Sequence, residues 1–305
     1  MTLADVYLVG APKCGTTSIA RWLAEHRDVY LSVPKEPFYW AADYPRMRAH
    51  YGFDSRGAYE ALYSNPAARA ATLRVDGSTT YLYSRCAVAD IDKAVPGARF
   101  VVTVRNPVDL LVSYHRTQLV ALNETETDFG TAWRRSLDGG RPDTDPLDPK
   151  LVDYPLVGRL GAAIGRLLTT VARERVHFVL FDDLVNDPSQ TWRGLTEFLG
   201  IPTQPEPSFD VHNASNKAYR SAVLRRLTHR PPALLEAPIR ALRQWSRTTA
   251  NPLVAVGKAR MWRSAAGPRV SDEVRSEVAE YLRADVDRLA TLLERSLPEW
   301  ASAGR

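Results

Sequence analysis

The chain has 305 residues, 45% of them hydrophobic and 25% charged, which is ordinary for a globular protein and fits one large domain or two small ones. No apolar run approaches the ~18 residues of a membrane-spanning helix, and the N-terminus lacks the basic region and long apolar core of a signal peptide. The only cysteines, Cys14 and Cys86, form neither a disulfide framework nor a zinc site, so we expect a reducing, cytoplasmic location. The net charge of +5 suggests an anionic partner without identifying it.

Apolar, β-branched runs that alternate with helical patterns predict an α/β fold. The predicted strands are residues 6–9, 73–75, 100–104 and 176–181. Strands separated by helices form a mostly parallel central sheet with helices on both faces, which is a three-layer arrangement. Phosphate sites in such sheets lie beyond the carboxyl ends of the strands, so the residues that follow each strand are the first candidates for a site.

A glycine-containing loop, GAPKCGTTS, follows the first predicted strand. Gly10 and Gly15 have the separation of a Walker loop, but Thr16 stands at the Walker lysine position and Lys13 lies inside the loop. The glycines let backbone N–H groups converge, and the start of the following helix adds unpaired N–H groups. The hydroxyl-bearing residues at that start are Thr16, Thr17 and Ser18. This pattern predicts a P-loop-like anion site in which Lys13 points at the group attached to the phosphate; a plain strand-to-helix turn is the alternative.

A second candidate anion site follows the third predicted strand. Arg105 comes directly after that strand, and Asn106-Pro107 is a typical helix start. Ser113 lies two turns into the helix, so an arginine fork and a hydroxyl could share a second phosphate. The alternative is that Arg105 pairs with Asp109 and that Ser113 only packs.

The second half of the chain is less regular. Residues 123–150 contain several proline turns and are expected to be a loop. Residues 217–269 hold twelve Lys or Arg against one acid, Glu236. Residues 270–300 read as a closing amphipathic helix. We expect residues 1–305 to form a single domain.

Taken together, these motifs resemble the sulfotransferases that use 3′-phosphoadenosine-5′-phosphosulfate (PAPS). In that family a P-K-x-G-T-[TS]-x-[LI] loop holds the 5′-phosphosulfate, and residues 12–19 read PKCGTTSI. The family's R-x-P-x-x-x-x-x-S segment holds the 3′-phosphate, and Arg105 through Ser113 match it. The stretches VHFVLFDDLVNDPSQTWRGLTEFLGI and DVDRLATLLERSLPEW also resemble family sequence.

The resemblance implies which residues hold PAPS, with adenosine 3′,5′-bisphosphate as the product and no metal. The implied donor contacts are Lys13, Cys14, Gly15, Thr16, Thr17, Ser18, Arg105 and Ser113. The segment FDVHNASNKAYRS resembles a late nucleotide-contacting loop of bacterial relatives, in which Lys217 and Arg220 could reach the 3′-phosphate or could simply be solvated. Lys13 would stabilise the charge that develops on the bridging oxygen during transfer.

Transfer to a hydroxyl also needs a base. The segment SVPKEPFYW resembles a K-E-P stretch of heparan-type carbohydrate sulfotransferases, in which the glutamate is taken as the base. The resemblance therefore implies that Glu36 is the base and that Lys35 and Glu36 contact the acceptor. A surface Lys-Glu pair before a proline turn is the alternative.

Other residues compete for the role of base. Asp76 ends a predicted strand in VDGSTTYLYS and could act as the base, orient Lys13 or Glu36, or merely cap a turn. His50 and His115 are further options, although no motif flanks either residue.

The acceptor is expected to be a hydroxyl-bearing carbohydrate or glycolipid, with a small secondary metabolite as the alternative. The basic segment 217–269 could lie on the inner membrane surface, hold an acidic sugar or be a solvated face. A nucleotide triphosphatase is disfavoured by Thr16, and a binding protein without turnover is disfavoured by the presence of Lys13, Glu36 and Arg105. No nucleic-acid-binding module is recognised, and the sequence does not indicate the oligomeric state.

Overall fold

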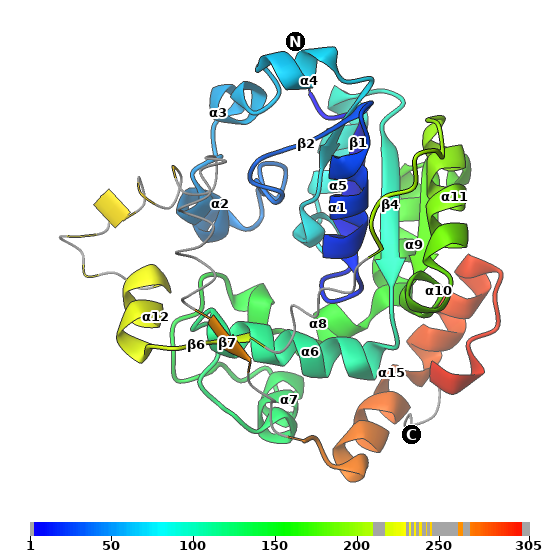
Figure 1. Ribbon diagram of the computed structural model, residues 1–305. Coiled ribbons are helices and arrows are strands. Elements are labelled where there is room, and N and C mark those ends of the chain that lie inside the picture. Colours follow the sequence, from blue (N-terminus) through cyan, green and yellow to red (C-terminus); the bar gives the residue numbers. More distant parts are fainter. Residues whose placement is uncertain are drawn as a thin grey trace.

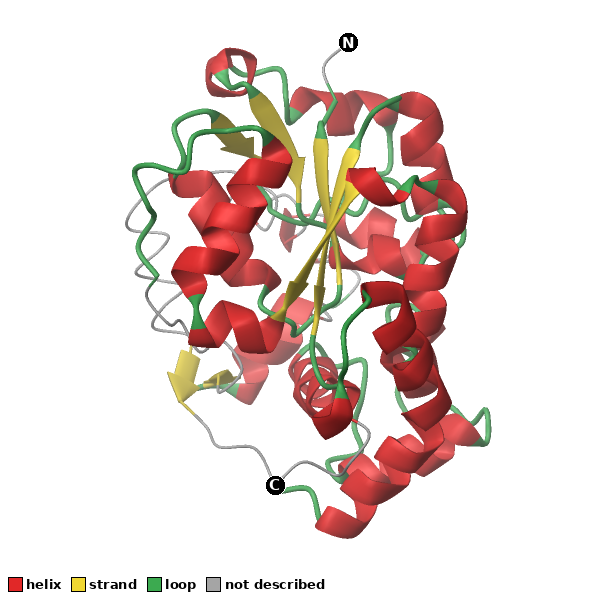
Figure 2. Cartoon of the chain, turned by 90° about the vertical axis from the view of Figure 1, so that its right-hand side faces the viewer, coloured by secondary structure: helices red, strands yellow, loops and turns green. Residues whose placement is uncertain are grey.

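The computed structural model describes residues 3–209, 217–229, 232, 235, 238–239, 242, 245, 262–264 and 269–300. Within these residues a central sheet is flanked by helices on both sides, and the C-terminal helix runs along one side of the molecule (Figures 1 and 2). The strands are β1 (Val6–Gly10), β2 (Val29–Leu31), β3 (Leu73–Asp76), β4 (Arg99–Val104), β5 (Val176–Leu180), β6 (Lys217–Tyr219) and β7 (Trp262–Ser264). The α-helices are α1 (Thr16–Glu25), α2 (Pro45–Tyr51), α3 (Arg56–Ala61), α4 (Pro66–Ala70), α5 (Ala87–Ala94), α6 (Pro107–Val120), α7 (Phe129–Leu137), α8 (Tyr154–Gly158), α9 (Leu160–Thr170), α10 (Phe181–Asn186), α11 (Pro188–Leu199), α12 (Ala222–His229) and α15 (Asp272–Leu293). Short 3-10 helices are η1 (Thr79–Leu82), η2 (Pro149–Val152), η3 (Arg173–Arg175) and η5 (Pro298–Trp300).

In the described part of the chain, strands β1 to β5 form one sheet in the order β2-β3-β1-β4-β5. Every pairing within this sheet is parallel. The carboxyl ends of β1, β3, β4 and β5 therefore meet at the same edge. Strands β6 and β7 form a separate antiparallel pair.

Alternate residues of each strand are buried on opposite faces of the sheet, because successive side chains of a strand point in opposite directions. One core cluster joins Tyr7 and Phe100 of the sheet to helices that include α6, α9 and α15. The second cluster joins Leu8 and Val101 to α1 and α11. Burial on both faces is typical of parallel sheets, and the two clusters confirm the predicted three-layer α/β fold.

Two local expectations were wrong. Strand β2 was not predicted, since it has only three residues and its signal is short. Residues 123–150, expected to be a loop, contain helix α7. Asp128 caps α7 by accepting a hydrogen bond from the Thr131 N–H, and Phe129 and Trp133, four residues apart, are both buried. The surrounding prolines obscured this short amphipathic pattern.

The predicted closing helix is α15, which begins after the capping residue Ser271. It packs on α9, where the Asp285 carboxylate accepts hydrogen bonds from the Gly161 N–H at 2.7 Å and the Ala162 N–H at 2.8 Å. A Cβ at Gly161 would lie 2.3 Å from the Asp285 carbonyl oxygen, so this close approach requires glycine.

Most of the basic segment 217–269 lies outside the described residues. None of the helices that are described is long and apolar enough to cross a bilayer.

Candidate active site

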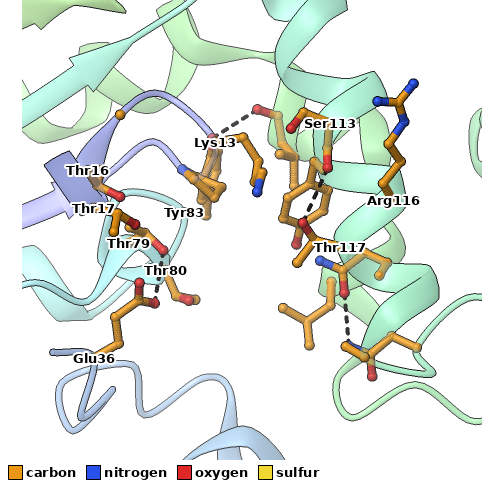
Figure 3. Close-up of a pocket in the computed structure, with 18 of the residues that line it drawn as sticks. Lys13, Thr16, Thr17, Glu36, Thr79, Thr80, Tyr83, Ser113, Arg116 and Thr117 are labelled. Atoms are coloured by element: carbon orange, nitrogen blue, oxygen red, sulfur yellow. Dashed lines mark hydrogen bonds between the residues drawn. The ribbon is translucent and has the colours of Figure 1, made fainter. Parts of the chain in front are cut away.

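A pocket of ≈ 1320 Å³ lies at the edge of the sheet where the carboxyl ends of the strands meet. Figure 3 shows Lys13, on the loop after β1, facing Ser113 and Thr117 of α6 across the pocket, with Glu36 hydrogen-bonded to Thr79. The pocket lining includes the sequence-predicted residues Lys13, Gly15, Thr16, Thr17, Ser18, Glu36, Arg105 and Ser113. The fold thus brings segments that are distant in sequence to one site.

The loop after β1 turns sharply into α1. Lys13 and Gly15 have positive φ values of 66° and 87°. A Cβ at Gly15 would lie 3.2 Å from side-chain carbons of Phe181 and Leu184, so both backbone and packing favour glycine here. No side chain caps the helix at Gly15, and the first N–H groups of a helix have no acceptor within it. The start of α1 therefore presents backbone donors and the threonine hydroxyls to an anion.

Lys13 is the charged group of this loop. Among the described residues its ammonium group has no hydrogen-bond or ion-pair partner, and it lines the pocket. Burial lowers the pKa of Lys13 and nearby Arg105 lowers it further, whereas Glu36 raises it. An ammonium group held next to another cation is stabilised strongly when negative charge develops beside it. Cys14, in contrast, is buried with its Sγ 3.5 Å from the Pro12 carbonyl oxygen, so only its backbone is available to a ligand.

Arg105 stands at the carboxyl end of β4, the strand next to β1. Its guanidinium group lies over the Phe181 ring at 4.4 Å from the centroid, and its Nη1 donates a hydrogen bond to the Lys13 carbonyl oxygen at 3.4 Å. The predicted alternative, a pair with Asp109, is long at 4.0 Å. Asp109 instead accepts a hydrogen bond from Arg275 at 2.7 Å. Arg275 thus takes up much of the charge of Asp109, and Arg105 keeps its capacity to bind an anion.

One face of α6 lines the pocket. Val112, Ser113, Arg116 and Thr117 recur at the three- and four-residue spacing that places side chains on the same side of a helix. Ser113 is buried except for its edge toward the pocket, and its carbonyl oxygen accepts a hydrogen bond from Thr117 Oγ1 at 3.3 Å. This position is compatible with the predicted contact of Ser113 to a second phosphate, which stays a prediction.

Glu36 lies between a cation and a hydroxyl. Its Oε1 is 2.8 Å from Lys35 Nζ, and its Oε2 accepts a hydrogen bond from Thr79 Oγ1 at 3.2 Å. Lys35 Nζ also donates to Thr16 Oγ1 at 3.3 Å, so Lys35 connects the carboxylate to the start of α1. Glu36 is 30% exposed and lines the pocket, which leaves its carboxylate accessible to an acceptor hydroxyl.

Asp76 lies behind the pocket and not in its lining. Its side chain is fully buried; Oδ2 accepts hydrogen bonds from Tyr59 Oη at 2.8 Å and Tyr81 Oη at 2.9 Å, and Oδ1 accepts one from the Ser78 N–H at 3.0 Å. Burial raises the pKa of Asp76 from 3.8 to about 6, although these hydrogen bonds oppose the shift. The expectation that Asp76 could accept the proton of the acceptor is corrected by this position, because no atom of its side chain is open to the pocket.

The pKa of Asp76 makes the stability of the fold depend on pH. The folded state retains the Asp76 proton up to about pH 6, whereas the unfolded chain releases it near pH 3.8. Between these values the folded state binds more protons, so the unfolding free energy should decrease as pH rises and then level off above pH 6. We expect wild type to lose about 3 kcal/mol relative to Asp76→Asn over this range. Urea unfolding of both proteins across this range measures the effect, and a difference that does not vary with pH would contradict it.

The remaining predicted residues have different positions. His50 lines the pocket, whereas His115 is buried with its Nε2 2.8 Å from the Glu126 carbonyl oxygen and is not part of the lining, so its candidacy as the base is corrected. Arg220 is exposed and does not line the pocket. Lys217 belongs to β6, but its side chain lies outside the described residues.

Several pocket residues were missed by sequence reasoning. Phe181 follows β5 as Arg105 follows β4, so the strand-end rule could have identified it. Trp22 is a core residue, 3% exposed, that packs edge-on against Phe209 at 4.9 Å between ring centroids, and both residues also line the pocket. Arg275 carried no sequence signal, because its place depends on how α15 crosses α6.

Among the residues described, no cluster of His, Cys, Asp and Glu could hold a metal ion.

A parallel sheet whose edge carries a lysine-bearing glycine loop beside a second cation has the architecture of a group-transferring enzyme. Residues 3–232 match the family model of the sulfotransferase domain, and the chain therefore belongs to this enzyme family. Over 164 residues it is 25% identical to carbohydrate sulfotransferase 15 of Homo sapiens, with 42% of this chain aligned. The chain spans only 29% of the length of that relative. Among solved structures, a sulfotransferase from Alicyclobacillus acidocaldarius has the same fold, with a TM-score of 0.70 and 21% identity over 98% of this chain and 99% of that chain.

Proposed function

We propose that this protein transfers the sulfuryl group of PAPS to an acceptor hydroxyl and releases adenosine 3′,5′-bisphosphate. The observation that carries the proposal is the placement of Lys13 and Arg105 at the ends of neighbouring parallel strands in one pocket. A nucleotide with phosphate groups at both ends needs two such cationic positions. The unpaired amides at the start of α1 and the edge of Trp22 provide further contacts that suit an adenylate.

PAPS supplies an activated sulfuryl group, whose bond to the 5′-phosphate oxygen breaks as a bond to the acceptor oxygen forms. Lys13, next to the start of α1, stabilises negative charge at that bridging oxygen. Glu36 takes the proton of the acceptor hydroxyl. Lys35 and Thr79 orient the Glu36 carboxylate, and Arg105 with Ser113 holds the 3′-phosphate.

For the acceptor, we propose a carbohydrate or glycolipid hydroxyl. This choice is supported by the K-E-P segment and by the human relative, whose name specifies carbohydrate. A small-molecule metabolite is the alternative, because aromatic and aliphatic side chains also line the pocket, among them Tyr44, Met47, Tyr51 and Leu147. Incubation with PAPS and separate sets of oligosaccharides, glycolipids and phenolic metabolites, followed by mass spectrometry, distinguishes these classes.

Nucleotide binding tests the central claim. Calorimetry with adenosine 3′,5′-bisphosphate in the presence of a metal chelator should detect micromolar binding. Arg105→Ala should weaken this binding by roughly 10- to 100-fold, as expected for the loss of charged hydrogen bonds worth about 1.5–3 kcal/mol.

Arg134→Ala is the matched control for Arg105→Ala. Arg134 lies on α7, forms an exposed ion pair with Glu277 and does not line the pocket, but its removal changes the net charge equally. An equal loss of affinity in both variants would indicate a general charge effect, and absence of binding by wild type would remove the proposal.

A further inference from the structure

We infer that Asp76 is a positioning residue whose buried carboxylate holds the Glu36–Trp40 segment and η1 in the arrangement that orients Glu36. The inference rests on the proposed function, because it concerns the orientation of the proposed base. In this role Asp76 affects the reaction by orienting Glu36 and makes no contact with the acceptor.

The segment that carries Glu36 is bound along its length to the segment that follows β3. The Ser32 N–H donates to the Val75 carbonyl oxygen at 3.0 Å, and the Gly77 N–H donates to the Lys35 carbonyl oxygen at 2.9 Å. A Cβ at Gly77 would lie 2.8 Å from the Lys35 side chain, so the two segments are in close contact. The backbone that leads into Glu36 is thus fixed relative to β3.

Beyond Glu36, the contacts pass through the residues that bind Asp76. The Phe38 N–H donates to Ser78 Oγ at 3.0 Å, and the Ser78 N–H donates to Asp76. The Trp40 N–H donates to Tyr81 Oη at 3.3 Å, and the Tyr81 hydroxyl donates in turn to Asp76. Asp76 therefore accepts hydrogen bonds from the same two residues, Ser78 and Tyr81, that accept hydrogen bonds from the Glu36–Trp40 segment.

A third connection comes from α3. The Trp40 Nε1–H donates to Tyr59 Oη at 3.1 Å, and the Tyr59 hydroxyl donates to Asp76 Oδ2. A hydroxyl that donates to a carboxylate is a better acceptor for a second donor, because hydrogen bonds in a chain polarise one another. The carboxylate thus sets the direction of the two connections that run through the Tyr59 and Tyr81 hydroxyls.

The backbone conformation of Phe38 shows why such support is needed. Phe38 has a φ of 60°, in the left-handed region that a bulky residue rarely adopts, and such a residue persists only where its surroundings over-determine it. The Phe38 side chain is buried against Tyr51, with 4.5 Å between ring centroids, while its N–H is bound to Ser78. This strained residue lies two positions after Glu36.

The same network reaches Glu36 from the opposite side. Asp76 fixes Ser78, the residue just before η1, and Thr79, the first residue of η1, donates a hydrogen bond from its hydroxyl to Glu36 Oε2. Both the backbone of Glu36 and the hydroxyl that binds its carboxylate therefore depend on Asp76. A buried carboxylate is costly to the fold, and a costly group that organises a site is typical of functional regions.

The test replaces Asp76 by asparagine, which has nearly the same shape but donates from one of its two polar atoms. We expect kcat to fall roughly 10- to 100-fold, because a displacement of about 1 Å is enough to misorient a reacting group. The KM for PAPS and the affinity for adenosine 3′,5′-bisphosphate should change less than about threefold, since Lys13 and Arg105 are not part of the network. Ser78→Ala, which leaves Asp76 in place and removes one connection, should give a smaller fall in kcat and serves if Asp76→Asn folds poorly.

Asp285→Asn is the matched control. Asp285 is a partly buried carboxylate that also accepts backbone hydrogen bonds, but it joins α15 to α9 and does not line the pocket. This control should lose stability and retain kcat. Equal kcat values for Asp76→Asn and Asp285→Asn would overturn the inference.

A double-mutant cycle distinguishes positioning from direct proton transfer. If Asp76 acts through Glu36, Asp76→Asn should lower kcat less than about threefold in a Glu36→Gln background, because the two effects are not additive. A full additional loss in that background would overturn the inference.

Hydrogen exchange tests the positioning without any assay of turnover. The amides of Phe38 and Trp40 should exchange faster in Asp76→Asn than in wild type and in Asp285→Asn. Unchanged exchange would overturn the inference, whereas a wild-type protein that does not turn over PAPS would remove only the proposed function.

Discussion

Replacement of Lys13 by alanine should lower kcat by about 10²- to 10³-fold, the range typical for loss of a preorganised group that stabilises developing charge. The affinity for adenosine 3′,5′-bisphosphate should change much less, because the amides at the start of α1 and Arg105 remain. The physical reason is the setting of Lys13, which lines the pocket without a counter-ion among the described residues and lies near Arg105. Its interaction therefore strengthens mainly when the bridging oxygen becomes negative.

Steady-state kinetics with PAPS and calorimetry with the product nucleotide measure these two effects separately. Lys93→Ala removes the same charge from an exposed position on α5 that does not line the pocket, and it should leave both quantities unchanged. A Lys13→Ala variant that loses affinity and turnover to the same extent would show that Lys13 binds the ground state and transition state equally.

Glu36→Gln should lower kcat by about 10²- to 10⁴-fold, the range associated with general base catalysis. Glutamine preserves the shape of the side chain and can still interact with Thr79, but it does not accept a proton at neutral pH. Binding of the nucleotide should be retained, because Lys13, Arg105 and the start of α1, which we propose to hold it, are unchanged in this variant. Single-turnover measurements with preformed enzyme–PAPS complex isolate the chemical step.

Glu60→Gln is the corresponding control, since Glu60 forms an ion pair with Arg56 on α3 and does not line the pocket. Turnover of this control should match that of wild type. Near-normal turnover by Glu36→Gln would reject Glu36 as the base, and His50, which also lines the pocket, would then be the next candidate.

The placement of the glycine loop and Arg105 in one pocket could be predicted from the sequence because its determinants are local. Gly10, Gly15 and Lys13 lie within one short loop, and the strand before it and the helix after it are both recognisable. Arg105 and Asn106-Pro107 mark the end of a strand and the start of a helix in the same way. Since parallel strands end at one edge of a sheet, the convergence of these two segments followed from the α/β pattern.

The acceptor side and the support of the base depended on contacts that local patterns do not encode. Asp76 could be singled out as an acid at a strand end, but nothing in its neighbours indicated that Tyr59, Ser78 and Tyr81 would enclose it. The closer contact of Asp109 with Arg275, at 2.7 Å against 4.0 Å with Arg105, likewise depends on where α15 crosses the rest of the chain.

The sequence by itself determined the α/β class, the glycine loop between β1 and α1 and the cation after β4, because each depends on residues that are close in the chain. Only the tertiary structure decided which carboxylate is open to the pocket and which is buried behind it. The physical reason is that exposure depends on the groups packed around a side chain. Glu36 meets Thr79 from 43 residues along the chain, and Tyr59, 17 residues away, helps to enclose Asp76.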